Sequence, residues 1–278
     1  ALHEAAALAE PVSPPLAGLF IGNAGVIRHE NHLDAEEAYD DLTRAISLLD
    51  ATDLKINLAE VHLHTCMLAH EEAVEAGAPF GEAISHYLRV LQLVEQSDMP
   101  YLWASAHLNL ATAYLTSPMT EASDQLRSGV AVLSLRSALE VFTREEYPDQ
   151  WASTTINLAN ALVYVQSNKQ GDNLVEAVEK YEEVLELRGI DVDPVGRARL
   201  LANQGNALAH LGIFDHAKAK LYEARMLFEQ ELDHDAVLMV RGVLDEISKA
   251  SVPSTEEERA AELVSLAETA ASGGQVMG

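Results

Sequence analysis

A twelve-residue pattern occurs twice in this sequence and constrains the fold more than any other feature. The pattern P-x-x-W-A-S-x-x-x-N-L-A begins at Pro100 and again at Pro148, 48 residues later. A weaker copy begins at Pro194, and a partial copy is found at Asn57. Self-similarity at a near-constant period predicts a stacked array, in which each repeat buries its apolar face against its neighbours.

A second pattern, A-x3-[L/Y]-x2-[A/V], follows each copy of the first. Steps of four and three residues place its three side chains on one face of a helix. The small residues at two of the three sites allow another helix to approach closely. Each repeat is therefore predicted to be a helical hairpin, with the Asn-x-[Ala/Gly] marker on its first helix and this pattern on its second. The second pattern begins at Ala38, Ala83, Ala131, Ala177 and Ala217.

With both patterns in place, the chain resembles the tetratricopeptide repeat (TPR) family. That family has small residues with the spacing of Gly205, Ala217 and Ala224. The earlier repeats are longer between their two helices, and the stretch from Glu145 to Ala152 is similar to a long-repeat subtype common in bacterial multidomain proteins. The resemblance implies an all-α, right-handed superhelical solenoid of about five helix-turn-helix repeats, over residues 35–250.

The two ends depart from the repeat pattern. Residues 1–34 are expected to form an N-terminal extension, with a short helix followed by an apolar segment that contains proline and glycine. Residues 251–278 are expected to form a C-terminal capping helix and a flexible tail. Ser254 and Glu257 have the spacing of a capping box, which would start that helix.

Charge limits the partners. The formal net charge is −26, from 44 acidic and 18 basic residues. Nucleic acids and anionic membranes both attract basic surfaces, so neither is an expected partner. Residues 1–126 contain only Arg28, Arg44, Lys55 and Arg89 as basic residues, against 19 acidic ones. This imbalance is typical of a soluble cytoplasmic protein, and it leaves open a basic partner that docks on the N-terminal half.

Neither a signal peptide nor an apolar run of about 18 residues is recognisable. Cys66 is the single cysteine, which rules out an intrachain disulfide. We therefore expect a cytoplasmic protein.

The residues that come nearest to a metal-ligand pattern are His62, Cys66 and His70. Their spacing of four residues places them along one helix stripe, but eight residues span about 12 Å of helix, too far for one tetrahedral ion. We predict no metal site and no cofactor. No catalytic motif is found either, so the chain is not expected to be an enzyme.

The resemblance also implies a binding surface. In the TPR family the first helices line a concave groove, and the register here gives an apolar stripe with hydrogen-bonding edges, suited to a peptide or an amphipathic helix. A carboxylate clamp needs several cations aimed into the groove, whereas the first helices supply only Lys55, Arg197 and Arg199, scattered over distant repeats. The predicted groove residues are Ile56, Glu60, Leu63, His64, Leu108, Thr112, Leu115, Thr116, Ile156, Asn160, Val163, Tyr164, Arg199, Asn206 and His210.

Three functions are compatible with this sequence. The first is a non-catalytic adaptor, scaffold or assembly factor that holds a protein partner in the groove. The second is a sensor or carrier that binds a small molecule or metal through the histidine-rich first repeats. The third is an accessory subunit of a multiprotein enzyme complex. Self-association and the identity of the partner are left open by the sequence.

Overall fold

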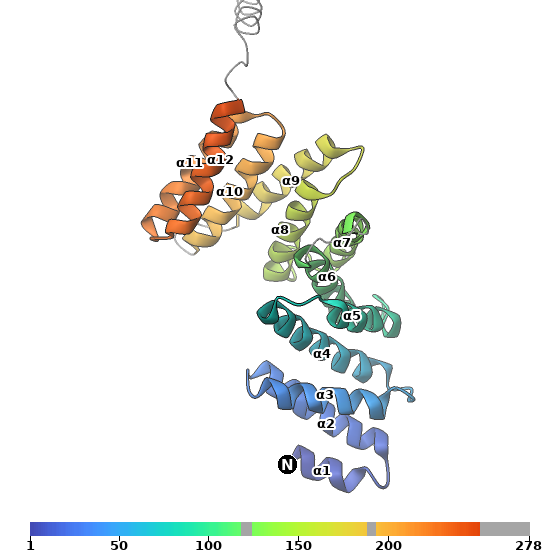
Figure 1. Cartoon of the computed structure of the whole chain (residues 1–278). Coiled ribbons are helices and arrows are strands. Elements are labelled where there is room, and N and C mark those ends of the chain that lie inside the picture. Colours follow the sequence, from blue (N-terminus) through green and yellow to red (C-terminus); the bar gives the residue numbers. More distant parts are fainter. Residues whose placement is uncertain (118–123, 188–192, 251–278) are drawn as a thin grey trace, which may run out of the picture. The chain divides into compact units, whose positions relative to one another are not determined.

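The computed structural model describes residues 1–117, 124–187 and 193–250 (Figure 1). Within those ranges every regular element is an α-helix, as predicted, and no strand occurs. The twelve helices of these ranges are α1 Leu2–Ala9, α2 Pro14–Glu30, α3 Ala35–Leu49, α4 Lys55–Ala76, α5 Gly81–Leu93, α6 Pro100–Thr116, α7 Asp124–Leu139, α8 Pro148–Tyr164, α9 Gln170–Leu185, α10 Pro194–His210, α11 Phe214–Gln230 and α12 His234–Ala250.

The chain divides into two compact units, 1–180 and 181–278, with the boundary inside α9. In the first unit, consecutive helices pack as the hairpins α2–α3, α4–α5 and α6–α7, and α1 packs on α2. In the second unit, α10 and α11 form a hairpin and α12 packs against α11. The expected boundary at residue 34 falls inside the α2–α3 hairpin, and the expected capping helix and tail at 251–278 lie outside the described residues.

Four of the first helices share one design. Each has 17 residues, begins with a proline and carries an asparagine at its tenth position. Proline at the start of a helix costs nothing, because its missing N–H would have no partner inside the helix. The four helices are α2, α6, α8 and α10, with Asn23, Asn109, Asn157 and Asn203.

This design corrects the assignment of the partial marker to Asn57. Asn57 is the third residue of α4, whereas the tenth is His64. The small residue of the marker is the twelfth, which in α4 is Cys66 and not Ala59. Ala59 and Cys66 are both fully buried, as are Ala111 and Ala159 at the twelfth positions of α6 and α8. Cys66 is the one whose side chain contacts Tyr87 of the second pattern on α5.

The residue at the twelfth position is small because the two helices of each hairpin touch there. A Cβ atom on Gly25 would lie 2.7 Å from Leu42 Cγ, and one on Gly205 would lie 2.7 Å from Leu221 Cγ. Both leucines belong to the second pattern, and its alanines and leucine or tyrosine residues are buried throughout, as predicted. Their exposed fractions are all at most 1%, for Ala38, Ala83, Ala131, Ala177, Ala217, Leu42, Tyr87, Leu135, Tyr181 and Leu221.

Candidate functional site

A groove of about 510 Å³ lies on the first helices α4 and α6 of two successive hairpins. Its wall is formed mainly by one face of each helix, since the positions recur three and four residues apart. Hydrophobic side chains dominate the floor, and carboxylate, amide and hydroxyl groups stand among them. The lining residues are Glu30, Ile56, Glu60, Leu63, His64, Met67, Met99, Tyr101, Leu102, Ser105, Leu108, Asn109, Phe142 and Gln150.

The floor and walls of the groove differ in exposure. Leu63 and Leu102 are 8% and 7% exposed and form its base. Ile56 and Tyr101 are each 47% exposed and stand at its walls. Exposed apolar side chains beside a buried apolar base provide apolar surface that a partner would remove from water on binding.

Tyr101 is held in place by α8 and by the segment that joins α7 to α8. Its ring lies 5.6 Å from the rings of both Phe142 and Tyr147, measured between centroids. Gln150 Nε2 of α8 donates a hydrogen bond of 3.3 Å to the Tyr101 hydroxyl. These contacts fix one wall of the groove before any partner binds, which reduces the entropy cost of binding.

His64 links the groove to α2. Its Nδ1 lies 2.8 Å from Nδ1 of His29, so one imidazole donates the proton and the other accepts it. The two rings meet edge to face, with centroids 5.1 Å apart. Burial lowers the pKa of both His29 and His64, because a charged imidazolium loses its hydration there. The pair is therefore neutral at neutral pH and ties α4 to α2.

Five of the predicted groove residues line this cavity, namely Ile56, Glu60, Leu63, His64 and Leu108. Six more lie outside it, on α6 (Leu115 and Thr116) and on α8 (Ile156, Asn160, Val163 and Tyr164). Of these, Val163 is buried and Tyr164 is 67% exposed. Thr112 is also on α6, and its hydroxyl accepts a 3.3 Å hydrogen bond from Asn157 of α8. The remaining three, Arg199, Asn206 and His210, are on α10 in the second unit.

Sequence reasoning missed several lining residues because the marker of α4 was placed too early. When His64 of α4 is matched with Asn109 of α6, Leu63 corresponds to Leu108 and Glu60 to Ser105. All six line the groove. The signal for this register was the tenth position of the 17-residue helices, and the missed residues include Met67, Met99, Tyr101, Leu102, Ser105 and Asn109.

The candidate metal ligands point to separate partners. His62 Nδ1 lies 2.7 Å from His86 Nδ1 of α5. The Cys66 thiol donates to the Leu63 carbonyl at 3.0 Å, and burial raises its pKa. The ring of His70 packs on Phe80, with centroids 4.7 Å apart. Across the described residues, no group of three or more histidine, cysteine or carboxylate side chains is arranged to hold a metal ion.

Comparison with known proteins bears on the fold. No family model matches the sequence, and no curated protein matches it. The structure resembles that of BtubC (BKLC) from P. vanneervenii, with a TM-score of 0.55 and 18% identity over 83% of this chain and 87% of that chain. It is also similar to PilF from Pseudomonas aeruginosa, with a TM-score of 0.46 and 15% identity over 90% and 97% of the two chains.

At 18% identity the likeness to BtubC shows the fold alone. Together with the successive hairpins and their close-packed small residues, it shows that this chain is a TPR-like helical repeat protein. Among the helices described, none is both long and apolar enough to cross a membrane.

Proposed function

We propose that this protein is a non-catalytic adaptor, or an assembly factor of a larger complex, that holds a segment of a protein partner in the groove on α4 and α6. The observation that carries the proposal is the groove itself, which has a buried apolar base, half-exposed apolar walls and polar groups at its edge. Interfaces of this kind take an amphipathic helix or an extended apolar segment.

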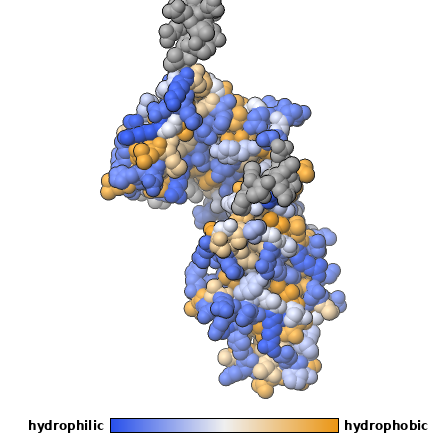
Figure 2. All heavy atoms as spheres, viewed as in Figure 1, coloured by the Kyte–Doolittle hydropathy of each residue, from blue (hydrophilic) through white to orange (hydrophobic). Residues whose placement is uncertain are grey.

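The face in view in Figure 2 and the net charge of the chain are in agreement with a protein partner. Hydrophilic side chains (blue) cover most of the face in view in Figure 2, and hydrophobic ones (orange) appear on it as separate patches. A net charge of −26 disfavours nucleic acid and anionic membranes as partners. The proposed location is the cytoplasm, in agreement with a single, buried cysteine.

The binding surface is proposed to extend beyond the groove along the first helices. On α6 and α8, half-buried Leu115 and Ile156 and exposed Tyr164 supply further apolar contacts. The hydroxyl and amide groups of Thr112, Thr116 and Asn160 on the same two helices supply hydrogen bonds. Val163 of α8 is a buried apolar side chain of this surface. In the second unit, taken by itself, Arg199, Asn206 and His210 of α10 are proposed as separate partner contacts.

Removing apolar contacts from the groove will release the partner. In the variant Ile56→Ser with Leu108→Ser, both changed side chains line the groove. Because Leu108 also packs against the cluster around Phe142, circular dichroism first establishes that the variant is folded. Centrally placed apolar anchors carry most of the binding energy of an interface, so we expect the variant to lose at least ~2 kcal/mol of binding free energy for the partner. Affinity purification of the tagged protein from an extract of its source organism, quantified by mass spectrometry, measures this loss.

The matched control is Leu126→Ser with Leu133→Ser on the outer face of α7. These leucines are 75% and 67% exposed and lie outside the groove. The control should recover the same proteins as the wild type. Equal recovery of those proteins by the groove variant would place the binding surface elsewhere.

A further inference from the structure

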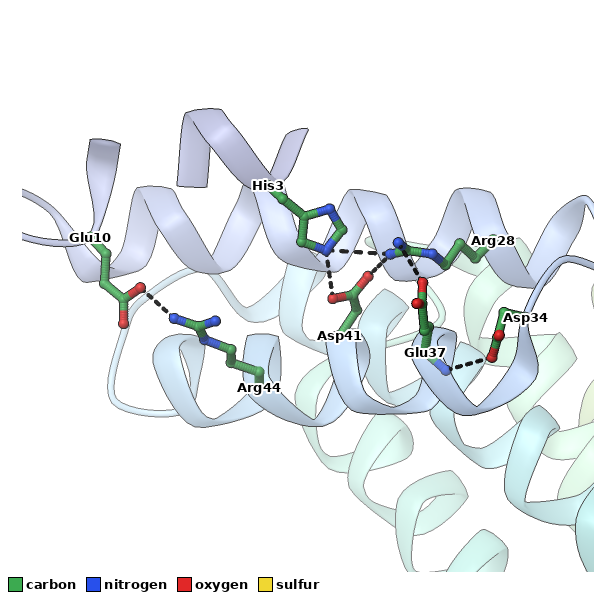
Figure 3. Close-up of polar contacts among 7 residues, drawn as sticks. All are labelled: His3, Glu10, Arg28, Asp34, Glu37, Asp41 and Arg44. Carbon is green, nitrogen blue, oxygen red and sulfur yellow. Dashed lines mark hydrogen bonds and ion pairs between the residues drawn. The ribbon is translucent and has the colours of Figure 1, made fainter. Parts of the chain in front are cut away.

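The few cations of the N-terminal 126 residues are largely engaged away from the groove. Arg28 pairs with Asp41 and, at 2.9 Å, with Glu37 (Figure 3). Arg44 pairs with Glu10 at 2.5 Å, as the same view shows. Arg89 pairs with Asp50 at 2.9 Å. Three of the four basic side chains are thus held by carboxylates that do not line the groove.

The carboxylates at the groove lack such partners. Glu30, from the end of α2, and Glu60, from α4, are exposed and line the groove, and its lining contains no lysine or arginine. Within residues 1–117, 124–187 and 193–250, neither carboxylate has an ion pair. The apolar floor is therefore bordered by uncompensated negative charge.

A second cavity continues this charge along α4. It has a volume of about 500 Å³, and four glutamates line it together with Ala35, Tyr39 and Leu68. Met67 lines the groove, and Glu71, one turn further along the same side of α4, lines this cavity, so the two adjoin on α4. None of the four has an ion pair in the described part of the chain: Glu36, Glu71, Glu72 and Glu75.

His29 lies between the two groups of carboxylates. Both Glu30 of the groove and Glu71 of the second cavity act electrostatically on its imidazole. His29 in turn pairs with His64, which lines the groove. The apolar groove and the acidic cavity are therefore adjoining parts of one surface, to which α2, α3, α4 and α6 contribute.

We propose that the partner segment carries apolar side chains that fill the groove and, beside them, lysine or arginine side chains that enter the acidic cavity. This inference rests on the proposed function and names the chemistry of the partner. Ammonium and guanidinium groups would form charge-assisted hydrogen bonds with carboxylates that repel one another in the free protein. The negative field would also accelerate encounter with a basic segment.

The geometry sets the spacing of the two features in the partner. Leu63 at the base of the groove and Glu71 in the acidic cavity are eight residues apart, on neighbouring faces of α4. At the rise of an α-helix their separation along the helix axis is about 12 Å. An extended segment covers that length in about four residues. An extended partner therefore carries its basic residues about four positions from its apolar anchor.

The experiment is a selection of binders from a displayed library of random 16-residue peptides, using the full chain as bait. We expect enriched sequences to combine large apolar residues with lysine or arginine about four positions away. A synthetic peptide of the most enriched sequence is then measured by fluorescence anisotropy. We expect Glu71→Gln with Glu72→Gln to weaken its binding at least tenfold, and to reduce the dependence of binding on salt concentration.

The matched control is Glu145→Gln with Glu146→Gln, which removes the same charge from exposed residues outside both cavities. It should bind the peptide as the wild type does. Suppose instead that enriched peptides show no basic preference, and that they depend on Ile56 and Leu108 but not on Glu71 and Glu72. The partner chemistry would then be wrong while the groove function stands. If the wild type enriches nothing beyond what Ile56→Ser with Leu108→Ser enriches, both are overturned.

Discussion

Replacing Gly205 by leucine is expected to destabilise the α10–α11 hairpin by about 3 kcal/mol, the upper end of the cost of overpacking a core. Even the first carbon of the new side chain would lie 2.7 Å from Leu221 Cγ and 3.2 Å from the Ala217 carbonyl oxygen. The backbone oxygen cannot turn away as a side chain can. The two helices would have to separate, and the contacts along their interface would be lost.

The matched control is the same substitution at Gly129, in the middle of α7. A Cβ atom there meets nothing within 4 Å. Because leucine favours the helix over glycine by up to about 1 kcal/mol, Gly129→Leu should be neutral or stabilising. Urea unfolding followed by circular dichroism compares the two variants. Equal midpoints for Gly205→Leu and the wild type would show that α10 and α11 do not approach at this residue.

Acid is expected to destabilise the first unit well before its carboxylates are protonated. Burial of His62, and then the neighbouring His86 and Arg89, lower the pKa of His62 from 6.5 to about 4. The unfolded chain therefore takes up a proton near pH 6.5 that the folded chain refuses until about pH 4. Stability is complete above pH 6.5 and falls between pH 6.5 and 4, by about 3 kcal/mol for a shift of this size.

Other groups will act in the same direction. Burial also lowers the pKa of His29, His64, His70, His86 and His107. Asp50 opposes the shift at His62 by favouring its charged form, but burial outweighs it. The acid sensitivity of the first unit is therefore spread over α2, α4, α5 and α6, with His62 as the largest expected contributor.

Urea unfolding at a series of pH values tests this expectation. His62→Leu should flatten the loss of stability between pH 6.5 and 4, because the protonating group is gone. His216→Gln, an exposed change on α11, should leave the loss as it is in the wild type. A wild-type protein with constant stability from pH 7 to 4.5 would contradict the burial of these imidazoles.

Much of the fold could be predicted from the sequence, because the residues at helix contacts are set by close packing. A close approach of two helices admits only small side chains, so Ala83, Ala131 and Ala177 recur at nearly regular intervals. The same logic failed for α4. That helix has 22 residues and no initial proline. The sequence Asn57-Leu58-Ala59 matches the marker, but it stands seven residues before the equivalent position at His64.

The site was less predictable because it depends on residues that are distant in sequence. The pair of His29 and His64 joins residues 35 apart, and no periodic pattern indicates such a contact. Gly25 was hidden in an apolar, glycine-containing stretch that resembles a loose extension, although it occupies the same kind of contact as Gly205. The acidic cavity combines residues of α3 and α4, and even the nearest of them in the sequence, Tyr39 and Leu68, are 29 positions apart.

Photo-crosslinking tests most directly whether the groove on α4 and α6 is the binding surface. The photoreactive amino acid p-benzoylphenylalanine is placed singly at Ile56, Leu108, Leu126 or Leu133, and each protein is irradiated in an extract of its source organism. We expect protein adducts of the same mass from Ile56 and Leu108, and none from Leu126 and Leu133. Adducts from the α7 positions, with none from Ile56 or Leu108, would contradict this expectation.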